Sequence, residues 1–179
     1  MGLSSNETLE AFVKRIVSNE KIMNIMQLPT INSTDSEEVI KQKRNILINN
    51  FISKTAQIPY ELGTSFEDVE IDKKKYSDFG KIRITISLAQ AIKLNHDLFN
   101  NPQVDINIYY DNTKIEDVFK LLDLISDEFS GKDLIIEGEN EKNFIRNIRC
   151  EGTTAQTAII NNYERVGLRF SFFATVYKI

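Results

Sequence analysis

The residues in this sequence that are best suited to chemistry are carboxylates near a lysine. Asp72 and Lys74 have an acid-x-lysine spacing, and Asp111 directly follows the apolar run that ends at Tyr110. Carboxylates gathered at strand ends can hold Mg²⁺, as a metal-dependent nuclease requires. However, Asp72 lies in an irregular lysine-rich segment, and Asp111 has the position of a turn or helix-capping residue. A metal-dependent nuclease is therefore the leading enzymatic alternative, not the main interpretation.

Histidine and cysteine chemistry is restricted by composition. His96 is the only histidine and Cys150 is the only cysteine, which excludes multi-histidine metal sites, cysteine-based zinc clusters and an internal disulfide. Asp97 lies beside His96, but no nucleophile elbow completes a hydrolase site. The 7 glycines form no Walker or dinucleotide pattern, so a backbone cradle for nucleotides is not expected. We predict a protein without catalytic, metal-binding or cofactor-binding residues, and therefore no enzyme.

Two charged clusters are interpreted as solvated surface. Glu137, Glu139 and Glu141 lack the remaining ligands of an EF-hand loop, so they indicate a hairpin turn. The lysines at positions 73–75 could contact phosphates, but a lysine triplet in a loop more often serves solubility. The net charge of −4 does not give the overall basic footprint of a nucleic-acid-binding protein.

Length and hydropathy favour one folded domain. The chain has 179 residues, of which 41% are hydrophobic and 27% charged, and both fractions are ordinary for a folded protein. No apolar run approaches the roughly 20 residues that span a bilayer. The N-terminal residues lack the basic and apolar regions of a signal peptide, so we expect the chain to stay in the compartment where it is made.

The first third is predicted to be helical. Apolar residues at helical spacing indicate one helix from about Ser5 to Glu20, and the same spacing allows it to continue to Met26 before Pro29 stops it. A capping-box spacing at Thr34 and Glu37 predicts the start of a second helix, which continues to about residue 52. Residues 57–80 have the composition of a loop.

The remaining two thirds contain strand patterns around one helix. Alternating apolar residues predict strands at 82–88, 104–110 and 166–176, and shorter apolar runs predict strands at 133–138 and 143–150. The connection 89–103 is too long for a tight hairpin. Thr113 and Glu116 have capping-box spacing at the start of a helix, and Gly131 fits its C-terminal end. The apolar stripe of this helix comprises Ile115, Val118, Phe119, Leu122, Ile125 and Phe129.

This order of elements predicts an α+β fold in one domain that spans residues 1–179. Two N-terminal helices occupy a helical part at 1–56, and a sheet-and-helix body follows at 81–179. The body has the order β-β-α-β-β-β, with a small, mostly antiparallel sheet and one helix packed on it.

The same order of segments resembles the neck proteins of long-tailed bacteriophages, which form the tail-terminator, head-completion and stopper subunits between portal and tail. The stretch "IMNIMQLPT" stands where members of the family carry an apolar helical segment, and "EEVIKQKRNILINNFI" matches their lysine- and isoleucine-rich helix. "KIRITISL", "VDINIYYDN" and "VGLRFSFFATVYKI" match family strands, and "KIEDVFKLLDLISDEFSG" matches the family helix. The family strand usually ends in a Cys-His pair, where this chain has Tyr110 and Asp111.

The resemblance implies a structural virion protein that forms a ring, as a hexamer or dodecamer, around the DNA channel. Its partners would be further copies and the neighbouring neck, portal or tail proteins, with no membrane, and DNA would pass without specific binding. The location implied is the neck and tail junction of the virion, assembled in the bacterial host cytoplasm. The connections 89–103 and 58–81 are the expected arms toward neighbours, and Leu98, Phe99 and Pro102 are the predicted interface residues. A small soluble α+β binding or regulatory module is the first alternative, and the metal-dependent nuclease is the second.

Overall fold

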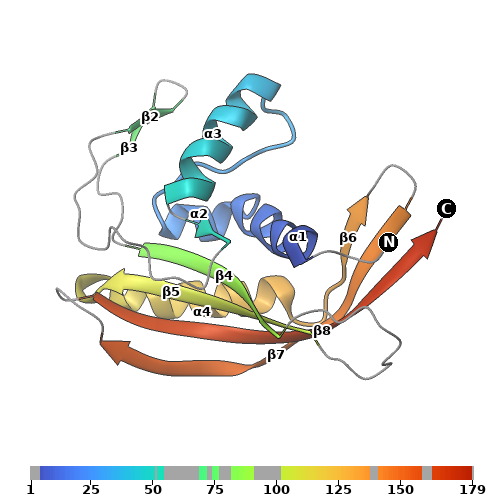
Figure 1. The fold of residues 1–179 in the computed structure, drawn as a ribbon. Helices are drawn as coiled ribbons and strands as arrows, with labels where there is room; N and C mark the ends of the chain where they lie inside the picture. The colour runs from blue at the N-terminus through green and yellow to red at the C-terminus, as the bar shows by residue number, and fades with distance from the viewer. Residues whose placement is uncertain are drawn as a thin grey trace.

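The computed structural model describes residues 5–50, 52–54, 69–71, 74–76, 82–90, 102–137, 141–158 and 163–178. Within these ranges the predicted α+β class is confirmed, because N-terminal helices precede a curled antiparallel sheet with a long helix packed on it (Figure 1). The helices are α1 (Ser5–Val17), α2 (Glu20–Ile25), α3 (Glu37–Asn50), the 3-10 turn η1 (Asn112–Lys114) and α4 (Ile115–Phe129). The strands are β1 (Ile52–Ser53), β2 (Val69–Ile71), β3 (Lys74–Tyr76), β4 (Ile82–Gln90), β5 (Gln103–Asp111), β6 (Leu134–Glu137), β7 (Glu141–Ala158) and β8 (Tyr163–Lys178).

The described N-terminal region contains three helices instead of two, because the helix predicted from about Ser5 ends at Val17 and the stretch that leads to Met26 forms the separate helix α2. Asn19 ends α1 and begins α2, since its side-chain Oδ1 accepts hydrogen bonds from the N–H groups of Lys21 at 3.1 Å and Ile22 at 3.2 Å. Its Nδ2 also donates to Oε2 of Glu128 on α4 at 2.5 Å. A polar side chain that satisfies free helical N–H groups competes with helix continuation, and here it turns the chain between two short helices.

We expect Asn19→Ala to lower the free energy of unfolding by about 1 kcal/mol, the usual cost of losing an N-terminal cap. Chemical denaturation of the wild type and the variant measures this difference. Ser18→Ala is the matched control, because Ser18 is exposed and its hydroxyl donates to the Lys14 carbonyl in the last turn of α1, not to a free N–H of α2. Equal losses at both positions would contradict the capping role of Asn19.

The start of α3 also differs from the prediction. The hydroxyl of Ser36, not of Thr34, accepts a hydrogen bond from the N–H of Val39 at 3.4 Å. Lys43 of α3 is buried, and its Nζ donates to the Thr30 carbonyl and to Asp35, both at 2.8 Å. This bond from Lys43 holds the pKa of the Asp35 carboxyl below its usual value, so the buried lysine is a paired charge that fixes the loop before α3.

The larger sheet has the strand order β1-β4-β5-β8-β7-β6. The short β1 runs parallel to β4, and the other neighbouring pairs are antiparallel. Strands β2 and β3 form a separate antiparallel pair inside the region 57–80 that was predicted to be a loop, so the loop prediction is wrong for these residues. The predicted short strand at 143–150 is part of the 18-residue β7, which pairs with β8 through several register shifts.

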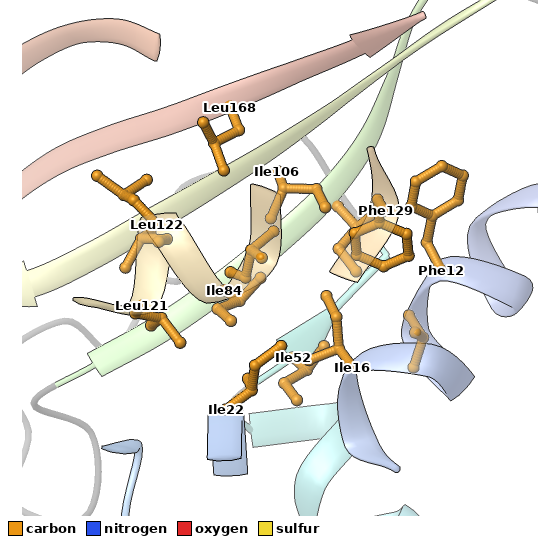
Figure 2. Close-up of a cluster of buried hydrophobic side chains, with 14 of the residues drawn as sticks. Phe12, Ile16, Ile22, Ile52, Ile84, Ile106, Leu121, Leu122, Phe129 and Leu168 are labelled. Carbon is orange, nitrogen blue, oxygen red and sulfur yellow. The ribbon is translucent and has the colours of Figure 1, made fainter. Parts of the chain in front are cut away.

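The hydrophobic core lies between the helices and one face of the sheet. Phe12 of α1 and Phe129 of α4 are fully buried, and Figure 2 shows their rings next to each other. The two ring centroids are 4.7 Å apart. The buried stripe of α4 comprises Val118, Leu121, Leu122, Ile125 and Phe129. The predicted stripe is therefore wrong at two positions, since the side chains of Ile115 and Phe119 are 36% and 54% exposed.

The junction between β5 and α4 is built by Asp111. Its Oδ1 accepts hydrogen bonds from the Thr113 N–H at 2.9 Å and the Thr113 hydroxyl at 2.6 Å, which caps η1 before α4 begins. The interpretation of Asp111 as a capping residue is confirmed, whereas the predicted capping box at Thr113 and Glu116 is wrong. At the other end of α4, Gly131 has a φ of +73°, which is the left-handed conformation expected of a helix C-terminal glycine.

The sheet face that points away from the helices carries polar rows. In one row Asn107 of β5, Gly167 of β8 and Thr154 of β7 are direct neighbours. A Cβ atom on Gly167 would lie 2.6 Å from Asn107 Oδ1 and 2.8 Å from the Ile106 carbonyl oxygen. The side chain of Asn107 thus occupies the space above Gly167, and glycine is the residue that this close approach requires.

Candidate interaction surfaces

The structure places one of the three predicted interface residues. Leu98 and Phe99 lie outside the described residues. Pro102 is buried immediately before β5, and its carbonyl accepts a hydrogen bond from the N–H of Phe172 at 3.2 Å. Its ring is therefore covered by this chain itself, and the assignment of an interface to the loop before β5 stays a prediction.

The residues considered for chemistry are not brought together in the described part of the chain. Asp72, His96, Asp97 and Glu139 lie outside it. Asp111 is engaged in capping, and Cys150 is half-buried against the core. Among the described residues, no group of three or more histidine, cysteine, aspartate or glutamate side chains is placed to hold a metal ion. Within the same residues, no helix combines the length and apolar character needed to cross a membrane.

Tyr110 of β5 has a strongly raised pKa. Burial raises its pKa to about 12, and the hydrogen bond that its hydroxyl donates to Oε2 of Glu164 at 2.8 Å acts in the same direction. Tyr110 and Glu164 are direct partners across β5 and β8. Because its pKa is raised, Tyr110 stays protonated at neutral pH and donates this hydrogen bond across the ends of β5 and β8. We therefore interpret it as a structural residue.

The first exposed apolar surface lies on the N-terminal half of α4. We define the helix patch as Ile115, Glu116, Phe119 and Asp123, all of which are exposed. Ile115 and Asp123 are four residues from Phe119 and Glu116 is three, so all three side chains neighbour it on the helix surface. The exposed Lys120 is four residues from Glu116 and three from Asp123, so the apolar side chains of the helix patch have both carboxylates and a lysine beside them.

The second exposed apolar surface lies where β6, β7 and β8 run side by side. We define the sheet-end patch as Ile135, Phe144, Arg146 and Phe173. Ile135 pairs with Phe144 and Arg146 pairs with Phe173 in the strand register, so all four lie on the face away from the helices. Ile135 is 60% and Phe173 is 47% exposed. The Arg146 guanidinium lies over the Phe144 ring, 4.7 Å from its centroid.

A groove separates α1 from the edge strand β6. Its volume is about 780 Å³, and its walls include Glu7, Lys14 and Arg15 of α1 and Leu134 and Ile136 of β6. In the described sheet β6 pairs with β7 on one side and has no strand on the other. A groove between an edge strand and a helix is the geometry in which an extended segment adds to a sheet.

Glu10 of α1 also lines this groove and ties α1 to the following elements. Its carboxylate pairs with Arg44 of α3 and with Lys54, whose Nζ lies 3.0 Å from Oε2. Burial raises the pKa of Glu10, but the hydrogen bonds and charges of Arg44 and Lys54 outweigh burial and hold the pKa below its usual value. The ionised form of Glu10 is therefore the form that stabilises the fold.

We expect the ion pairs of Glu10 to stabilise the fold at neutral pH but not in acid. The pKa of Glu10 in the folded state lies below its value of about 4.3 in the unfolded chain. Its contribution to the free energy of unfolding is therefore complete above the unfolded pKa and disappears as the pH falls through the folded pKa. Glu10→Gln should lower the free energy of unfolding at pH 7, and the difference from wild type should shrink as the pH falls below about 4. Denaturation curves between pH 3 and pH 7 measure it, and a difference independent of pH would contradict the ion-pair explanation.

In the residues that the structure describes, the protein has an α+β fold with two exposed apolar patches and a groove at a sheet edge. Compared with known proteins, the chain matches no family model and no curated relative.

Proposed function

We propose that this protein is a structural subunit of the bacteriophage head–tail neck, which forms a ring as a tail terminator or as a head-completion or stopper protein. The observation that carries the proposal is the exposure of Ile115, Phe119, Ile135 and Phe173 on a body whose described helices and larger sheet pack around one hydrophobic core. Exposed apolar side chains that gather in patches are typical of protein–protein contacts. The resemblance of the segment order to neck proteins supports this kind of assembly.

A ring subunit needs a rigid body and surfaces for its neighbours. The body here is one core that joins α1, α2, α4 and the sheet, and the helix patch and the sheet-end patch are its candidate contacts. Further copies of the chain and the adjoining portal or tail proteins are the proposed partners, and DNA passes through the channel. No catalytic step belongs to this role.

Two measurements test the role. Light scattering on the purified protein should give the mass of a hexamer or dodecamer, and negative-stain images of the same sample should show rings with a central hole. An antibody against the chain should label the junction of head and tail on phage particles that carry it. Label on another part of the particle, or particles without the protein, would contradict the neck assignment.

The groove between α1 and β6 favours the alternative, a binding or regulatory module that takes an extended segment of a partner along its edge strand. Such a module would bind one partner molecule per chain without building a ring. Light scattering of the complex distinguishes the two roles, because a mass of one chain plus one partner favours the module.

A further inference from the structure

We propose that a shallow cradle over Gly167, on the sheet face that points away from the helices, binds a phosphate group. Arg165 of β8 supplies the positive charge, and Thr154 of β7 and Asn107 of β5 supply further hydrogen bonds. The inference goes beyond the ring and does not depend on it. It is carried by the missing side chain at Gly167, by buried polar atoms without hydrogen bonds and by the charges around them.

The floor of the cradle is a residue without a side chain. Gly167 lies between Asn107 and Thr154 across the strands. Arg165 and Arg169 lie two positions before and after it on β8, so all of these residues belong to one face of the sheet. A Cβ atom on Gly167 would lie 2.6 Å from Asn107 Oδ1 and 3.1 Å from Thr154 Oγ1. Two polar side chains therefore lean over the glycine from opposite sides.

Polar atoms around this floor are buried and make no hydrogen bonds. Within the part of the chain that the structure describes, these atoms are Thr154 Oγ1, Arg165 Nε and Thr85 Oγ1. Thr85 is 0% exposed and is the direct neighbour of Asn107 on β4. Buried groups left unsatisfied cost free energy, so they indicate a bound water or ligand. Thr154, Arg165 and Asn107 are only half-buried, so small rotamer changes open the cradle to solvent.

The unpaired charge at the cradle is positive. Arg169 is held by Asp105, whose carboxylate oxygens accept hydrogen bonds from its Nε at 2.7 Å and its Nη2 at 2.8 Å. Arg165 has no carboxylate in the equivalent place, because its cross-strand neighbours are Tyr109 and Thr157. A half-buried guanidinium group without a carboxylate partner favours an anion from outside the chain.

The carboxylates beside Arg165 in the strand register are engaged by other groups. Asp111 lies on the next rung of the same face, and its Oδ1 caps η1. Glu164 precedes Arg165 in the chain and accepts hydrogen bonds from the Tyr110 hydroxyl at 2.8 Å and from Gln156. Both carboxylates thus have structural roles in the described residues, and neither supplies the anion that the cradle lacks.

A phosphate group fits this set of side chains better than a carboxylate. The Arg165 guanidinium approaches along β8, the Thr154 hydroxyl from β7, and the Asn107 amide from β5 after a half-turn that directs its NH2 group inward. Donors from three directions suit a tetrahedral anion, whereas one guanidinium fork satisfies a planar carboxylate. The source of the phosphate group is a free phosphate ion or a DNA backbone, whose contacts carry no sequence information.

Binding of inorganic phosphate tests the cradle. We expect isothermal titration calorimetry at constant ionic strength to show saturable binding to the wild type. Arg165→Gln should weaken this binding by roughly tenfold or more, because it removes charged hydrogen bonds. Thr154→Val keeps the shape of the side chain but removes the hydroxyl, so it should weaken binding severalfold. Circular dichroism verifies that each variant is folded, and if Arg165→Gln does not fold, Thr154→Val decides.

Arg149→Gln is the matched control. Arg149 is an exposed arginine on the same face, and it pairs with Ser171, which lies beyond Arg169 on β8. Glu151 accepts a hydrogen bond from that Ser171, so this arginine has a carboxylate near it. Arg149→Gln should bind phosphate like the wild type. Equal weakening by Arg149→Gln and Arg165→Gln would show general attraction to surface arginines and would overturn the cradle.

The remaining outcomes also decide for or against the cradle. No binding of phosphate in the millimolar range overturns it and leaves these polar groups to water alone. Weakening by Arg165→Gln without any effect of Thr154→Val overturns it too, because a single arginine then explains the binding.

A short DNA duplex identifies the source of the phosphate group when the cradle binds phosphate as expected. A duplex that competes with phosphate and binds Arg165→Gln more weakly shows a backbone phosphate, and a duplex that fails on either count shows a free ion. These results are separate from the masses, images and antibody labelling that test the neck role.

Discussion

Phe129→Ala is expected to lower the free energy of unfolding by about 3–5 kcal/mol, the range for removing a fully buried aromatic side chain. The Phe129 ring lies between α1 and β8, 4.7 Å from the centroid of Phe12 and 5.6 Å from that of Phe170. Its loss leaves a cavity where the helices meet the sheet, and neighbouring rings on different elements cannot all move to fill it. Urea denaturation followed by circular dichroism measures the change.

Phe119→Ala is the matched control for this prediction, because the same residue type is replaced in the same helix. Phe119 is 54% exposed, and exposed substitutions usually change stability by no more than about 0.5 kcal/mol. Both variants should be compared at a concentration at which the chain is monomeric, since association would stabilise the wild type by mass action. Similar losses for the two variants would show that the core described around Phe129 is wrong.

Gly167→Ala is expected to cost about 1–3 kcal/mol, as overpacking in a filled site does. The new Cβ would lie 2.6 Å from Asn107 Oδ1 and 2.8 Å from the Ile106 carbonyl oxygen. The amide of Asn107 can rotate away, but the carbonyl belongs to the backbone of β5, so the strands must separate locally. Replacing glycine by alanine also stabilises a protein by roughly 0.4–1 kcal/mol, because it reduces the conformational freedom of the unfolded chain. The cost of the clash must therefore exceed this gain, and the same denaturation experiment measures the net change.

A double variant separates the two parts of this clash. Asn107→Ala removes the side-chain oxygen, so the cost of Gly167→Ala should be smaller in that background but should not vanish, because the Ile106 carbonyl remains. The difference between the two costs is the interaction energy of the pair. An unchanged stability of Gly167→Ala in the wild-type background would contradict the close approach of β5 and β8.

The central strands could be predicted from the sequence because their burial follows a simple rule. Along β5, Val104, Ile106 and Ile108 face the core and are fully buried, and the residues between them point to the other face. A sheet covered by helices on one face imposes this alternation, so the pattern determines both the strand and its orientation.

The edge of the α4 stripe could not be predicted in the same way. Leu121 is buried and Phe119 is exposed, although the spacing of either residue fits a helix with Val118 and Leu122 in its core. The elements that pack against a helix determine which side of its apolar stripe is buried. The local periodicity of the sequence does not contain the positions of those elements. An apolar residue at a contact surface therefore has the same signature as one in the core, which is why both patches were missed.

Strand β7 shows a second reason for failure. Ile145 and Ile148 are both fully buried although they are three residues apart, which strict alternation forbids. The register shifts between Arg146 and Arg149, and Asn147 has a φ of +54°, so a bulge resets which residues face the core. Beyond this point the alternation is interrupted, and the sequence indicates only a short strand where a long one exists.

The place of β8 in the sheet has a consequence for synthesis on the ribosome. It lies between β5 and β7, yet it is made after both, and 51 residues separate the end of β5 at Asp111 from the start of β8 at Tyr163. At about 5–20 residues per second, β5 waits roughly 3–10 s for its partner. During that interval β5 and then β7 present open edges to other nascent chains, which is a hazard for aggregation. Chaperones that shield such edges should raise the yield of folded protein, and slower translation should lower it.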